Sequence, residues 1–165
     1  MTVRLIATAD VHHWRDIRLE ALRTEPQAFS TRHEDWADRP LADFAARFAT
    51  SHIFLAFDGA RPAGSVSWHA DPDVPGRGWI TSVFVTPSAR GKGIGRDLIS
   101  AALEHAGAAG IADMYLEVGA SNTSAQALYR VAGFAPFVGP DRPSASCGVC
   151  ELTMHLSLVG KDRGA

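Results

Sequence analysis

The stretch VTPSARGKGIGRDLI, residues 85–99, decides how the rest of the chain is interpreted. It places Gly91, Gly93 and Gly95 between an apolar run and the start of a periodic apolar pattern. The first turn of a helix has amides without intrahelical acceptors, at the positive end of the helix dipole. Glycines let a ligand approach such amides closely, so the stretch predicts a binding loop for an anion.

Three cations lie around the same amides, and their position narrows the choice of ligand. Arg90, Lys92 and Arg96 favour a phosphate or pyrophosphate. The phosphate loop of nucleoside triphosphatases ends in Lys-Ser/Thr, which is missing here, and the dinucleotide fingerprint G-x-G-x-x-G has a different glycine spacing. A tight connection between a strand and a helix, with no ligand, is the alternative.

Length and composition describe an ordinary globular domain. The chain has 165 residues, of which 46% are hydrophobic and 21% charged, with a formal net charge of -2. We expect one domain at residues 1–160 and a disordered tail at 161–165. The slight negative charge argues against nucleic acid as the main partner. No apolar run approaches the roughly 20 residues of a membrane span, and no signal peptide is evident, so we expect a cytoplasmic protein.

The hydrophobic pattern predicts an α/β fold in which helices cover a mixed sheet. In the last helix we expect Ala127, Leu128 and Val131 to face inward. The predicted strands are residues 3–9, 52–59, 61–70, 79–85, 114–120, 134–139 and 150–158, and the predicted helices begin near residues 11, 41, 94 and 124.

The two cysteines and the histidines give no metal or redox signature. Cys147 and Cys150 form a C-x-x-C that leads into a strand, where a spacing of three residues points the side chains to opposite faces. We interpret both as packing or edge residues and expect no metal. His69, alone in a predicted strand, is expected to be a hydrogen-bonded structural residue.

A second motif follows the glycine loop. It consists of Asn122, a helix that carries Tyr129, and the pair Gly133-Phe134 that closes this helix.

The two motifs together resemble those of the GCN5-related N-acetyltransferases, the GNAT family. Its acetyl-coenzyme A motif reads Q/R-x-x-G-x-G/A after a strand and at a helix start, and Arg90, Gly93 and Gly95 match it. The matches run from about residue 79 to residue 137. The resemblance implies a GNAT fold with a sheet of six to seven strands and four helices, splayed between the fourth and fifth strands.

The resemblance also implies a cofactor, acetyl-CoA, and the residues that bind it. The pantetheine arm would lie along the fourth strand like an added strand, and the loop amides would hold the pyrophosphate. The implied cofactor residues are Val83, Phe84, Val85, Arg90, Gly91, Lys92, Gly93, Ile94, Gly95, Arg96, Asn122 and Tyr129.

Tyr129 is our candidate for protonating the leaving thiolate. Since an ordinary phenol has a pKa near 10 and a thiol near 8.5, the transfer is uphill by only about 2 kcal/mol. The alternative is that the ring packs in the core and the hydroxyl bonds elsewhere.

Glu117 is our candidate base for the attacking amine, acting directly or through a water. Strand alternation places Glu117 with Tyr115 on one face, opposite Leu116 and Val118. A carboxylate twelve residues before Tyr129 also resembles the ribosomal-protein alanine acetyltransferases of the same family. The alternative is a solvated strand residue.

The acceptor is predicted only by class. With no broad acidic groove evident in the sequence, we expect a small amine or an amino-acid-like acceptor that attacks acetyl-CoA directly in a ternary complex. A protein N-terminus and a non-catalytic coenzyme A sensor are the alternatives. A homodimer is expected because such enzymes commonly form one.

Overall fold

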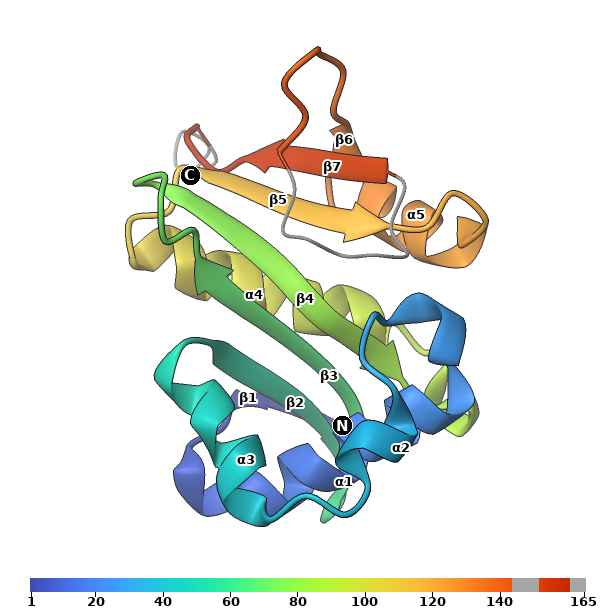
Figure 1. The fold of residues 1–165 in the computed structure, drawn as a ribbon. Coiled ribbons are helices and arrows are strands. Elements are labelled where there is room, and N and C mark those ends of the chain that lie inside the picture. The colour runs from blue at the N-terminus through green and yellow to red at the C-terminus, as the bar shows by residue number, and fades with distance from the viewer. Residues whose placement is uncertain (144–151, 161–165) are drawn as a thin grey trace.

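The computed structural model describes residues 1–143 and 152–160, which form one mixed sheet with helices on both faces (Figure 1). The order of the seven strands is β1-β2-β3-β4-β5-β7-β6. The strands are β1 (Thr2–Leu5), β2 (His52–Asp58), β3 (Arg61–Ala70), β4 (Arg77–Val85), β5 (Asp113–Val118), β6 (Ala135–Pro136) and β7 (Leu152–Ser157). The helices are α1 (Val11–Thr24), α2 (His33–Trp36), α3 (Leu41–Ala45), α4 (Ile94–Ala108) and α5 (Thr123–Val131).

The sheet opens between β4 and β5, as the sequence resemblance predicts. These two strands pair in parallel from Arg77 opposite Asp113 only as far as Ile80 opposite Leu116. The remaining half of β4 therefore has no partner in β5, and Figure 1 shows the two strands diverging.

A β-bulge in β4 begins just beyond the last of these pairs. Between two registered pairs of β3 and β4, Val66 alone lies opposite both Ser82 and Val83. Ser82 has a φ of 55°, and its carbonyl accepts a hydrogen bond of 2.9 Å from the Ser65 hydroxyl. A bulge bends its strand and increases the local twist, so it contributes to the divergence of β4 from β5.

The buried side chains of the described residues form two clusters, one on each face of the sheet. The larger packs α4 and α5 on one face, and the smaller packs α1 and α3 on the other. The face of α4 that packs on the sheet buries Ile94, Leu98, Ile99, Ala102 and Leu103. α1 likewise buries Trp14, Ile17, Ala21 and Leu22, and it ends at Thr24, before Pro26.

The prediction for α5 was wrong at two positions. Ala127 is exposed and Val131 is 73% exposed, whereas Gln126 and Tyr129 are buried. The Gln126 amide donates to the carbonyls of Gly119 and Ala120, both at 2.9 Å. A glutamine with its polar atoms satisfied can face inward, and this sets the rotation of a helix with few apolar residues.

Other differences from the sequence prediction are small. β1 ends at Leu5 rather than residue 9, β6 has two residues, and the one-turn helix α2 was not predicted. Cys147, Cys150 and the predicted tail at 161–165 lie outside the described residues. None of the described helices is long and apolar enough to cross a membrane.

Candidate active site

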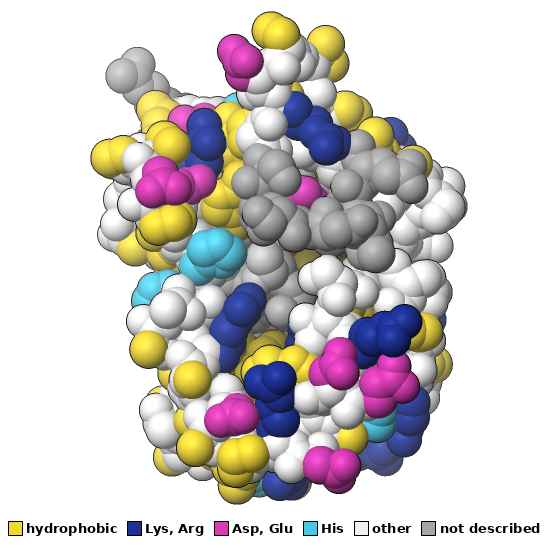
Figure 2. All heavy atoms as spheres, in the orientation of Figure 1, with side chains coloured by type: hydrophobic (Ala, Val, Ile, Leu, Met, Phe, Trp, Pro, Cys, Tyr) yellow, Lys and Arg dark blue, Asp and Glu magenta, His cyan; other side chains and the backbone are white. Residues whose placement is uncertain are grey.

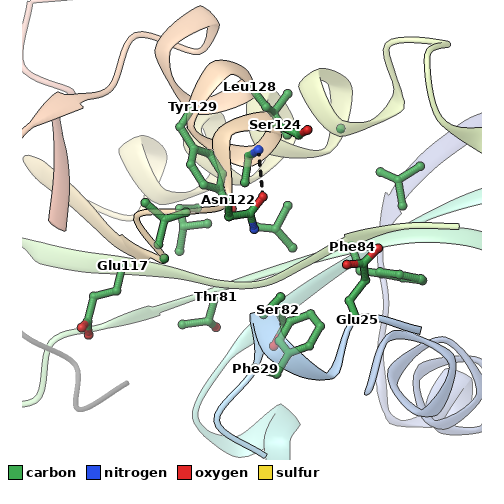
Figure 3. A pocket seen from close by; sticks show the side chains of 18 of the residues that line it. Glu25, Phe29, Thr81, Ser82, Phe84, Glu117, Asn122, Ser124, Leu128 and Tyr129 are labelled. Atoms are coloured by element: carbon green, nitrogen blue, oxygen red, sulfur yellow. Dashed lines mark hydrogen bonds between the residues drawn. The ribbon is translucent and has the colours of Figure 1, made fainter. Parts of the chain in front are cut away.

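A cavity of about 1080 Å³ occupies the opening between β4 and β5 (Figure 3). Side chains from both faces of the sheet line it, including Arg18 of α1 and Leu128 of α5. Lys92 is exposed and does not line it. The other predicted site residues do, namely Val83, Phe84, Val85, Arg90, Gly91, Gly93, Ile94, Gly95, Arg96, Glu117, Asn122 and Tyr129.

The glycine loop presents unused amides to this cavity. Gly91 and Gly93 have φ values of 76° and 81°, and Gly93 is the N-cap of α4. In the described part of the chain, no backbone carbonyl accepts from the amides of residues 91–96. The left-handed glycines turn successive N–H groups outward at the positive end of a 15-residue helix, which suits an anion.

Two conspicuous residues of this loop also have structural roles. The Arg90 guanidinium donates to the carbonyl of Val85 at 3.0 Å and pairs with Glu25 at 2.7 Å, so it ties the end of β4 to the segment after α1. A Cβ at Gly95 would lie 3.0 Å from Leu128 Cδ2. The absence of a side chain at Gly95 therefore lets α4 approach α5.

The far half of β4 is open on the side of the cavity. β4 pairs with β3 at Phe84 and Val85, but beyond Ile80 it has no partner in β5. An unpaired strand edge offers backbone donors and acceptors to any extended chain that lies along it.

Asn122 joins this part of the site from α5. Its Oδ1 accepts from the backbone amide of Ala125 at 3.3 Å and so caps the helix (Figure 3). The Oδ1 cap is structural, and the side-chain NH2 group has no hydrogen-bond acceptor among the described residues.

Tyr129 lines the cavity but packs in the core between α5 and the sheet. Its ring meets Phe134 edge-on at 6.2 Å. No hydrogen-bond partner for its hydroxyl is present in residues 1–143 and 152–160. Burial raises the pKa of Tyr129 above its ordinary value. The phenol is therefore neutral at pH 7 and keeps its proton, so it can donate a hydrogen bond.

Glu117 reaches the cavity from the opposite face of β5. Leu116, Val118 and Tyr129 belong to the cluster under α4 and α5, whereas Tyr115 packs against Trp79 on the other face. Figure 3 shows the Glu117 carboxylate pointing away from Tyr129 and Asn122, on the side where Thr81 lies. The two candidate catalytic side chains thus enter one cavity from different faces of the sheet.

Three cavity residues that sequence reasoning missed or set aside carry buried, unpartnered nitrogens. They are Arg18 (Nη1), Arg47 (Nε) and His69 (Nδ1), from α1, the 3-10 turn Ala46–Ala49 and β3. His69 was expected to be hydrogen-bonded, and for Nδ1 this is wrong. Burial and the charge of Arg47 lower the pKa of His69, so its imidazole is neutral at pH 7. Figure 2 shows basic and histidine side chains near the middle of the molecular face that it draws.

Comparison with known proteins gives one consistent family. Residues 11–134 match the Acetyltransferase (GNAT) family. A mycothiol acetyltransferase from Gordonia bronchialis is 34% identical over 126 residues, which are 72% of this chain and 40% of that protein. The chain therefore spans about two fifths of the length of this relative.

Solved structures show the same fold. The Salmonella typhimurium protein yncA, with its cofactor acetyl-CoA, has a TM-score of 0.74 and 24% identity over 100% of this chain and 96% of its own. A GNAT superfamily phosphinothricin acetyltransferase from Sinorhizobium meliloti, in complex with acetyl-CoA, has a TM-score of 0.75 and 22% identity over 94% of this chain and 87% of its own. The family match covers most of the sequence and agrees with the splayed sheet. This chain belongs to the GNAT acetyltransferase family.

Proposed function

We propose that this chain is an acetyl-CoA-dependent N-acetyltransferase that acetylates the primary amine of a small, amino-acid-like acceptor. One observation carries the proposal. A single cavity passes the open edge of β4, has unused amides at one end, and receives a phenol from one face of the sheet and a carboxylate from the other.

The residues at the donor end fit acetyl-CoA. The amides of residues 91–96 are a donor set for a pyrophosphate, and the unpaired edge at Val83 to Val85 suits an amide-containing arm. The NH2 group of Asn122 can contact the same arm from α5. When bound, acetyl-CoA supplies an acetyl group activated as a thioester.

Tyr129 would assist the departure of the thiolate chiefly as a hydrogen-bond donor. Its raised pKa makes full proton transfer to sulfur costlier than the roughly 2 kcal/mol of an ordinary phenol. A hydroxyl that lines the cavity and has no hydrogen-bond partner among the described residues can donate to an incoming sulfur.

The base that takes a proton from the amine would lie on the other face of the sheet. Glu117 is the candidate from the sequence, and its carboxylate points to that side. His69 is a second candidate, because it lines the same cavity with a neutral imidazole. Acid and base on different faces suit direct attack in a ternary complex, since donor and acceptor can enter from opposite sides.

Acetylation of a protein N-terminus and coenzyme A sensing are the competing functions. The sensor needs the loop amides but neither Tyr129 nor Glu117. A protein N-terminus needs a groove that continues from the cavity for the following peptide. A small acceptor is favoured by Arg18 and Arg47, whose charges make the acceptor side of the cavity basic rather than acidic.

Release of free thiol from acetyl-CoA tests the proposal. The assay would compare a panel of amino acids, simple amines and peptides with free N-termini, and mass spectrometry would confirm the acetylated product. We expect turnover with small amines. Acetylation of peptides alone would establish the N-terminal function instead, and coenzyme A binding without turnover of any amine would establish the sensor.

A further inference from the structure

Two arginines that line the cavity have buried guanidinium nitrogens with no carboxylate beside them among the described residues. Nη1 of Arg18 and Nε of Arg47 are buried and have no hydrogen-bond partner in the described part of the chain. Neither guanidinium takes part in an ion pair within residues 1–143 and 152–160. Arg18 packs over the ring of Phe29, with Cζ 4.8 Å from the ring centroid. Burying a charge without a partner is costly, so such groups are expected to meet a ligand.

The positive charges of Arg18 and Arg47 also repel each other. Burial, followed by the charge of Arg47, lowers the pKa of Arg18 to about 10, and burial lowers the pKa of Arg47 as well. At neutral pH both side chains are still cationic. The fold therefore keeps two like charges in one partly enclosed space, which an anion would stabilise.

The arginines mark a small recess that opens from the main cavity. A cavity of about 80 Å³ shares Arg18, Thr31, Arg47 and Ser82 with the larger one. A water molecule occupies about 30 Å³ in the liquid, so the recess suits a head group and not a whole acceptor. It offers guanidinium groups and two hydroxyls. Its carboxylate, Asp43, is half-exposed and lies 3.9 Å from Arg39 instead.

Arg47 is held in position at the opening of the sheet. Its Nη2 donates to Thr81 Oγ1 at 3.2 Å, and this hydroxyl lies 2.7 Å from Ser67 Oγ. Thr81 directly follows the last pair between β4 and β5. The anion site therefore lies four residues from Val85 along β4, roughly 13 Å from that end of the strand at 3.3 Å per residue, and the glycine loop lies beyond it. It is too far away to serve the pyrophosphate held by the loop amides.

From these contacts we propose that Arg18 and Arg47 form a carboxylate-binding subsite, and that the acceptor is a free amino acid or another amine bearing a carboxylate. This proposal rests on the proposed function. The carboxylate of the acceptor would accept charge-assisted hydrogen bonds from the two guanidinium groups. Its amine would then lie on the acceptor face near Glu117 and His69, between the carboxylate subsite and the thioester.

Matched acceptors test the proposal in the wild-type chain. Each amino acid of an aliphatic, thioether, aromatic and cationic set is compared with its own carboxamide, which keeps the side chain and the amine and mimics a peptide N-terminus. We expect kcat/KM for the best amino acid to exceed that of its amide by about 10- to 100-fold, as a charged hydrogen bond lost without replacement implies. Equal or better turnover of the amides would overturn the subsite and leave acetyl transfer intact.

Substitution of the arginines provides the second test. Arg18→Gln and Arg47→Gln should remove most of the preference for the carboxylate, chiefly through KM, while coenzyme A affinity is unchanged. Arg18→Lys and Arg47→Lys should restore part of it. Arg23→Gln, at an exposed position of the same helix, is the matched control. An equal fall in kcat for acids and amides alike would instead assign the arginines to the reacting carbonyl and overturn the subsite.

Measurements of the melting temperature and of direct ligand binding test the subsite where activity assays cannot. The two guanidinium groups are like charges without a carboxylate partner among the described residues. Each glutamine variant should therefore melt at the same or a higher temperature than the wild type. If the arginine had only a structural role, its replacement would lower the melting temperature. If no amine is acetylated, the proposed function fails. The subsite is then tested by thermal shift with N-acetyl amino acids and their amides in the presence of coenzyme A. A shift specific to the acids and lost in Arg18→Gln supports the subsite, and its absence overturns it.

Discussion

The donor and acceptor halves of the cavity are built in different ways. The donor half, where we propose that acetyl-CoA binds, is residues 83–96, a strand edge and a helix start that present mostly backbone amides. The acceptor half is Arg18, Arg47, His69 and Glu117, four side chains from four separate elements. One half is contiguous in sequence, and the other is assembled only by the fold.

We expect this difference to separate the binding of the cofactor from the choice of the acceptor. A backbone site binds the same ligand whatever the side chains are, provided that glycine and strand geometry are kept. Side chains on α1, the 3-10 turn Ala46–Ala49, β3 and β5 can change without disturbing it. The identity of the acceptor is therefore expected to depend on the acceptor half alone.

The largest effect is expected from Gly93→Val in the donor half. A β-branched residue at a φ of 81° is strained, and the loop amides cannot keep their orientation. We expect coenzyme A affinity to fall by about 100-fold or more, measured by calorimetry. Gly59→Val carries similar strain in the β2–β3 hairpin, at a φ of 60°, and should leave the affinity unchanged. Undiminished affinity in Gly93→Val would show that these amides do not hold the ligand.

The next effect is expected from Tyr129→Phe, where the two halves meet. The hydroxyl has no partner in the described chain, so its removal should not lower the melting temperature. We expect kcat to fall by about 10- to 100-fold, with coenzyme A affinity retained, because a positioned acid contributes at least this much. Tyr115→Phe, on the other face of β5, is the control. An unchanged kcat would leave Tyr129 as a packing residue.

A smaller effect is expected from Gly95→Val, and it divides the glycines of the motif by role. The new side chain would collide with Leu128, whose Cδ2 lies 3.0 Å from the ideal Cβ position. We expect a loss of about 1–3 kcal/mol in the free energy of unfolding, partly restored by Leu128→Ala. Coenzyme A affinity should change far less than in Gly93→Val. A loss of affinity as large as in Gly93→Val, with full stability, would assign Gly95 to the ligand instead.

The fold and the donor half could be predicted because their signals are local. Periodic apolar residues mark α1 and α4, the Gly59 turn marks the hairpin, and the glycine spacing marks the helix start. The bulge at Ser82 was not predictable, since serine has no general preference for a positive φ. In α5, Gln126 faced inward because two carbonyls were in reach, which periodicity alone does not show.

The acceptor half could not be predicted for a different reason. Arg18 and Arg47 lie in amphipathic segments where an arginine is normally solvated, and only tertiary packing buries their nitrogens. His69 was noticed in the sequence but was assigned the wrong environment. A charged residue becomes informative when its missing partner is visible, and this requires coordinates.

The smallest effect concerns the charge of the acceptor half, which is measured by the pKa of His69. Burial and then Arg47 lower its pKa below the ordinary value near 6.5, while Asp71 raises it. The unfolded chain therefore binds this proton first, so stability is lost as pH falls through 6.5 toward the folded-state pKa. His69→Gln should remove that part of the pH dependence, less than about 1 kcal/mol.

Arg47→Gln should raise the pKa of His69 in an NMR titration. The pKa of His52, also lowered by burial but beside His105, should not move. If both pKa values shift together, or neither does, Arg47 does not control the charge of the acceptor half, and the contrast between the halves loses its electrostatic basis.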